Sequence, residues 1–115
     1  MPYQAMLDEL VRSVPIIRAA LLLDSEGEIV VQSGQKDDRG RLIGAYQGIA
    51  VATVRRSSAR YGSISYMLCR YTWGRVILRP LKDDYYFVLA LPGDALPGQA
   101  LFRSAAVQVR LNKEL

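Results

Sequence analysis

The side chains that most often perform chemistry are scarce in this sequence. Its 115 residues include no histidine and a single cysteine, Cys69. Ser-His-Asp and Cys-His catalysis and most zinc sites need residues that are therefore missing. No glycine-rich phosphate-binding sequence follows any predicted strand. We expect no catalytic, cofactor-binding or metal-binding residues, and hence no enzyme.

Carboxylates occur in small groups along the chain. Two carboxylates that share an apolar cleft can act as general acid and base. Here each group falls on a predicted helix surface, turn or helix start, where turn and capping roles are the better interpretation. The groups are Asp8-Glu9, Asp24 with Glu26, Asp37-Asp38 and Asp83-Asp84.

Aromatic and basic residues raise the question of nucleic acid binding. The formal net charge is +4, but the arginines and lysines are spread along the chain without a block. Aromatic residues on neighbouring strands more often pack across the sheet than stack on bases. We therefore expect no nucleic acid partner. The aromatic residues concerned are Tyr66, Tyr71, Trp73, Tyr85 and Tyr86.

Length and composition predict one globular domain spanning residues 1–115. Half of the residues are apolar, which suits a folded chain with one core. The longest apolar runs are far below the roughly 20 residues that span a bilayer, so no membrane insertion is expected. Acidic residues near the N-terminus argue against a signal peptide, and Cys69 is expected as a small buried thiol. A cytoplasmic location follows as an expectation.

Hydrophobic periodicity and turn residues predict the order αββαβββα. Pro15 ends the first helix, Asp24-Ser25-Glu26-Gly27 forms a hairpin turn, and Pro80 is expected at a strand end or an edge. In the last helix, Leu101, Phe102, Ala105, Ala106 and Val109 are expected to face inward. The predicted elements are helix 3–14, strands 16–23 and 29–34, helix 39–60, strands 63–71, 75–81 and 85–91, and a helix from 99 to the C-terminus.

The middle helix carries an unusual stripe of small residues opposite its apolar arc. Each glycine inside a helix costs about 0.8 to 1 kcal/mol relative to alanine, so close approach of a second helix is an attractive explanation. A merely bland surface is the alternative. The stripe comprises Gly44, Ala45, Gly48, Ala52 and Ala59, with Arg55 as its only charge.

Two segments and their spacing resemble the roadblock (dynein light chain) family. Residues 14–30, around Asp24-Ser25-Glu26-Gly27, are similar to its first hairpin, and residues 79–89 to its fourth and fifth strands with their acidic turn. The resemblance covers essentially the whole chain. It implies an α/β (α+β) profilin-like sandwich, in which a five-stranded antiparallel sheet has the first and last helices on one face and the middle helix on the other.

The resemblance also implies partners. Family members form homodimers in which the middle helices pair antiparallel and the third strands join edge to edge. The stripe residues and Ser65, Met67 and Cys69 would then lie at the interface. Family members bind small Ras-like GTPases as scaffolds or by stimulating GTP hydrolysis. Lack of the long C-terminal extension of the stimulating bacterial members favours binding over stimulation. A sensor-like domain that binds a small ligand in a similar sandwich is the alternative.

Overall fold

The predicted element order is confirmed. The computed structural model describes residues 2–48, 60, 62 and 64–115. Predicted positions 49–59 of the middle helix lie outside the described residues. The elements are α1 (Pro2–Ser13), β1 (Ala19–Leu23), β2 (Ile29–Gly34), η1 (Lys36–Asp38), α2 (Arg39–Gly48), β3 (Met67–Tyr71), β4 (Gly74–Pro80), η2 (Lys82–Asp84), β5 (Tyr86–Leu91) and α4 (Gly98–Glu114).

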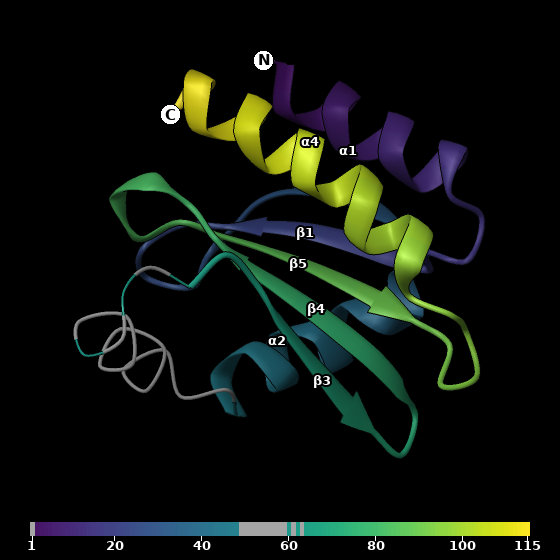
Figure 1. Cartoon of the computed structure of the whole chain (residues 1–115). Coiled ribbons are helices and arrows are strands. Elements are labelled where there is room, and N and C mark those ends of the chain that lie inside the picture. Colours follow the sequence, from purple (N-terminus) through teal and green to yellow (C-terminus); the bar gives the residue numbers. More distant parts are fainter. Residues whose placement is uncertain (1, 49–59, 61, 63) are drawn as a thin grey trace.

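The strands form one antiparallel sheet in the order β2-β1-β5-β4-β3. The almost continuously apolar β1 and β5 are central, as expected for strands buried on both faces. Helices α1 and α4 lie together over one face, and α2 lies under the other (Figure 1). The sandwich implied by the resemblance to the roadblock family is therefore correct.

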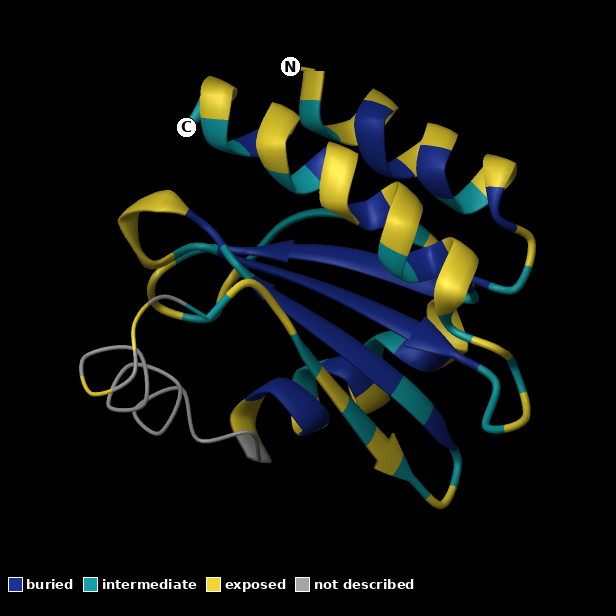
Figure 2. Cartoon of the chain, viewed as in Figure 1, coloured by how far each residue is buried: buried dark blue, intermediate teal, exposed yellow. Residues whose placement is uncertain are grey.

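Alternate residues of each central strand feed two separate cores. The core on the α1 and α4 side includes Leu7, Phe87 and Leu111, whereas the core on the α2 side includes Leu42 and Val88. Figure 2 shows both cores as the dark blue sheet and the inner faces of its helices. The two faces explain why a strand such as β1 needs apolar residues at every position.

The hairpin between β1 and β2 is fixed by one carboxylate. Asp24 Oδ1 accepts hydrogen bonds from the backbone N–H groups of Glu26 and Glu28, both at 2.9 Å. Gly27 completes the turn at φ +83°, which favours glycine. This arrangement confirms the predicted turn.

Replacing Asp24 tests the energetic role of that turn. We expect Asp24→Ala to lower the free energy of unfolding by about 1 to 2 kcal/mol, because two backbone donors lose their acceptor. Urea denaturation measures the effect, with Ser25→Ala in the same turn as control, since no hydrogen bond of the Ser25 side chain is seen among the described residues. Equal stability of both variants would contradict this role.

Two strands begin later than predicted. β1 starts at Ala19 rather than residue 16, because the chain turns where Ile17 N–H donates to Val14 C=O at 2.9 Å. β3 starts at Met67 rather than residue 63. Continued beyond Met67, its ladder would pair Tyr66 with Arg79 and then Ser65 with Pro80, which has no N–H to donate. The prediction that Pro80 ends a strand is confirmed.

The inward face of α4 was predicted wrongly. The buried residues are Ala100, Ser104, Val107 and Leu111, whereas Phe102 is 75% and Val109 is 55% exposed. Ala105 and Ala106 are also exposed, and Leu101 is partly buried. The inward stripe contains a polar residue because Ser104 Oγ accepts a hydrogen bond from Arg79 Nε at 2.8 Å. Hydrophobic periodicity alone could not identify this stripe.

Candidate interaction surface

The outward side of α2 is open along a row of glycines. Leu42 and Tyr46 are buried against the sheet, so residues about half a turn away face outward. Gly40 and Gly44 are exposed there, and a Cβ atom built on either would meet no described atom within 4 Å. Nothing described in the subunit explains why these helical positions should lack side chains.

Ala45 corrects part of the predicted stripe. It is only 5% exposed and belongs to the core on the α2 side, because it follows Leu42 by three residues on the buried arc. It is therefore not an outward residue. Of the other stripe residues, Gly44 lies on the outward side, and Gly48 is the last residue of α2 that the structure describes. Ala52, Arg55 and Ala59 lie outside the described residues.

Gly40 was missed when the stripe was predicted. Its signal is regular spacing, since Gly40, Gly44 and Gly48 follow one another every four residues. Residues four apart occupy one side of a helix. Gly40 and Gly44 are the residues of this row for which the spacing and the exposure agree.

β3 forms the second part of the surface because it is an edge of the sheet. Met67 and Cys69 point to the α2 side, where both are partly buried. Leu68 and Arg70 are exposed on the opposite face. Burial raises the pKa of the Cys69 thiol, which favours the unreactive thiol form. The predicted edge is confirmed, and its outer backbone has no partner strand in the described part of the chain.

A chain of aromatic and cationic contacts connects α2 with the end of β3. The rings of Tyr71 and Trp73 stack at 5.3 Å between centroids, with 12° between their planes. The Arg41 guanidinium carbon lies 5.7 Å from the Trp73 ring centroid, a cation–π contact. The first turn of α2 and the β3–β4 turn thus lie side by side. Tyr71 and Trp73 thus pack on each other within one turn, rather than across neighbouring strands as predicted.

Arg79 and Gln108 position the beginning of the edge strand. Arg79 is 3% exposed and donates to three groups of α4: Ser104 Oγ, Gln108 Oε1 and the Leu101 carbonyl, at 2.8 to 2.9 Å. Gln108 Nε2 donates to the carbonyls of Ser65 at 3.2 Å and Pro80 at 2.8 Å. Ser65 is therefore bound to α4 rather than paired in the ladder. Burial lowers the pKa of Arg79, and the neighbouring Tyr66 opposes that shift.

A separate polar contact lies at the opposite edge of the sheet. Asp8 on α1 accepts hydrogen bonds from Ser33 Oγ at 2.6 Å and Gln4 Nε2 at 3.0 Å. These bonds, the Ser33 bond first, lower the pKa of Asp8 below its ordinary value of 3.8. A carboxylate with a depressed pKa stabilises the fold above its unfolded pKa and loses that contribution as pH falls.

Asp8→Asn should consequently destabilise the protein more at pH 7 than at pH 3. The difference from the unmodified chain should shrink as pH falls from about 4, where the unfolded carboxylate takes up a proton, through the lower pKa of the folded carboxylate. Urea denaturation at both pH values measures it, and Ser33→Ala should show the same trend. Parallel stability curves for wild type and Asp8→Asn would contradict the assigned bond.

The described residues offer no centre for metal chemistry. No group of three or more His, Cys, Asp or Glu side chains gathers among them. Across the same residues, no helix is long and apolar enough to cross a bilayer.

The fold is that of Roadblock/LC7 domains. No protein-family model matches the sequence, and no curated protein sequence matches it significantly. Among solved structures, Myxococcus xanthus MglB is similar with a TM-score of 0.80 and 16% identity, covering 98% of this chain and 94% of MglB. A Roadblock/LC7 domain from Streptomyces avermitilis has a TM-score of 0.70 and 16% identity, with coverages of 96% and 92%.

The similarity extends to profilins. LokiProfilin1, from its complex with rabbit actin, has a TM-score of 0.66 and 13% identity and covers 98% of this chain and 96% of its own. The profilin-like sandwich expected from the sequence is thus found among the solved structures. At sequence identities of 13% to 16%, these comparisons show that the fold is shared.

Proposed function

We propose that this chain is a non-enzymatic homodimeric scaffold or regulator that binds a small Ras-like GTPase. The observation that carries the dimer is the coincidence of two features that have no partner among the described residues. They are the open side of α2 at Gly40 and Gly44 and the edge of β3. Exposed sheet edges are usually blocked or paired in proteins. In a homodimer, α2 and β3 of one copy would contact α2 and β3 of the second copy, so both features would gain a partner.

The proposed dimer joins two β3 strands into a continuous sheet and crosses two α2 helices. Glycines at positions 40, 44 and 48 allow the helix axes to approach more closely than the usual separation of about 8 to 10 Å. Met67 and Cys69 would complete their burial against the partner, and so would the exposed Leu68 on the other face. A two-fold axis between the strands makes the contact self-complementary.

GTPase binding is supported by the resemblance of the sequence to the roadblock family and by the fold shared with MglB and Roadblock/LC7 domains. A partner surface formed by two copies would explain why the chain dimerises. Regulation requires that one nucleotide state of the GTPase bind better than the other. The proposal therefore predicts a difference between the GTP and GDP forms.

A capture experiment tests the GTPase partner. Immobilised wild-type chain is mixed with the small Ras-like GTPase encoded nearest to it, loaded with a nonhydrolysable GTP analogue or with GDP. Retention of one form several-fold above the other supports regulation. Retention of neither form, or equal retention of both, contradicts a regulatory role. The chain alone should show no GTP turnover that survives repurification.

A further inference from the structure

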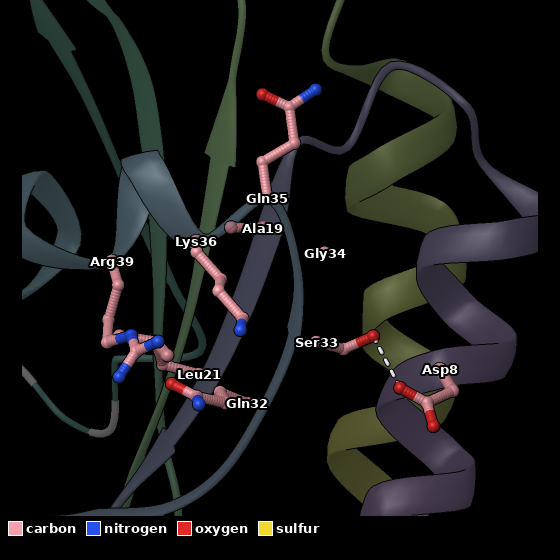
Figure 3. A pocket seen from close by; sticks show the side chains of 9 residues that line it. All are labelled: Asp8, Ala19, Leu21, Gln32, Ser33, Gly34, Gln35, Lys36 and Arg39. Atoms are coloured by element: carbon pink, nitrogen blue, oxygen red, sulfur yellow. Dashed lines mark hydrogen bonds between the residues drawn. The ribbon is translucent and has the colours of Figure 1, made fainter.

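A hollow of about 230 Å³ lies beside β2, at the sheet edge opposite β3. The chain leaves β2 here and passes through η1 into α2 (Figure 3). Part of the lining is apolar, formed by Ala19 and Leu21 of β1. The remaining lining is polar or glycine and comprises Asp8, Gln32, Ser33, Gly34, Gln35, Lys36 and Arg39.

Two cations in this hollow have no counterion among the described residues. The side chains of Lys36 and Arg39 both extend toward Gln32 (Figure 3). Neither forms an ion pair or hydrogen bond with the described part of the chain. Asp8 also lines the hollow, but its Oδ1 atom accepts hydrogen bonds from Ser33 and Gln4 and forms no ion pair with either cation. Like charges in one recess repel each other, and an anion placed between them would relieve that repulsion.

An unpartnered acceptor lies beside the cations. Gln32 Oε1 is buried and receives no hydrogen bond in the described structure. A buried acceptor without a donor is destabilising, and such atoms in native proteins call for an explanation. Lys36 and Arg39 can only donate. A ligand that fits all three groups must therefore accept hydrogen bonds at one end and donate one nearby.

We propose that this hollow binds a small oxyanion that also carries a hydroxyl group, as hydroxycarboxylates and phosphorylated polyols do. The oxyanion lies between Lys36 and Arg39, the hydroxyl donates to Gln32 Oε1, and the carbon skeleton lies against Leu21. The site uses none of the proposed dimer residues and lies at the other edge of the sheet. Ligand binding to the hollow can therefore be measured without a GTPase, and its failure would leave the proposed dimer untouched.

Matched ligand pairs test the chemistry. Glycolate against acetate, and glycerol 3-phosphate against methyl phosphate, differ in the presence of a hydroxyl and are titrated into the wild-type chain by NMR. The member with the hydroxyl should bind about tenfold more tightly, the contribution of one hydrogen bond to a buried acceptor. The pair that binds more tightly identifies a carboxylate or a phosphate ligand. Equal affinities within both pairs, or no binding, would overturn the proposal.

Two variants separate the cationic and the acceptor roles. Lys36→Met should weaken binding of both members of the preferred pair about tenfold or more. Gln32→Leu should weaken only the hydroxylated member and abolish the preference. Gln32→Glu should abolish binding because its carboxylate supplies the missing anion, whereas Gln99→Glu on α4 adds the same charge elsewhere and should change affinity less than twofold. Retained preference in Gln32→Leu would contradict the assignment.

Discussion

Gly44→Leu is expected to convert the dimer into a monomer with its helices intact. At the proposed crossing of two α2 helices, a leucine fills space that only hydrogen occupies, and overpacking of this kind costs about 1 to 3 kcal/mol for each copy. In the isolated subunit, the same substitution is expected to increase stability. The position is exposed with open space around it, so removing a helical glycine stabilises it by up to about 0.8 kcal/mol.

Sedimentation equilibrium and circular dichroism together measure this result. The dissociation constant of the dimer should rise at least about tenfold, which corresponds to about 1.4 kcal/mol. The helical circular dichroism signal should be unchanged. Ala5→Leu, on the exposed side of α1, is the matched small-to-large control and should leave the mass unchanged. An undisturbed Gly44→Leu dimer would show that this side of α2 does not form the contact.

Arg79→Ala is expected to cause the largest loss of subunit stability, about 3 kcal/mol or more in the free energy of unfolding. The substitution removes three hydrogen bonds from a charged donor, each of which contributes about 1.5 kcal/mol or more before relaxation. It also leaves Ser104 Oγ and the Leu101 carbonyl without that donor. Gln108, which binds Ser65, loses its anchor, so the start of β3 should loosen too.

Urea denaturation with hydrogen exchange distinguishes these effects. Arg103→Ala, an exposed arginine on α4, is the control and should change the unfolding free energy by less than about 0.5 kcal/mol. Arg79→Met should restore part of the loss, because an apolar side chain of similar length avoids an unfilled cavity. If Arg79→Ala is no more destabilising than Arg103→Ala, the bonds to α4 contribute nothing.

The element order was accessible to sequence reasoning because its signals are local, whereas the placement of the helices on the sheet was implied by the resemblance to the roadblock family. The apolar spacing of α1, the turn at Asp24 and the continuous apolar residues of β1 each report a single element. The inward face of α4 was not accessible. Ser104 is buried only because Arg79 comes from a strand 25 residues earlier in the chain, and a contact between distant elements leaves no periodic pattern.

The candidate surface was only partly accessible for the same reason. Spacing found Gly44 and could have found Gly40, since both lie on one four-residue row. Ala45 was misplaced because alanine is found on both the buried and the exposed sides of helices, so the residue type alone does not distinguish them. Gln32, Lys36 and Arg39 line the hollow at β2 together because the chain turns at η1 between them. Neither charge nor spacing separates these residues from other surface side chains.

Light scattering on the unmodified chain at micromolar concentration tests the central claim most directly. If α2 and β3 meet the same elements of a second copy, the measured mass is twice 12.8 kDa and returns to that of one chain in Gly44→Leu. A mass of one chain for the unmodified protein, unchanged as concentration rises, would contradict the account.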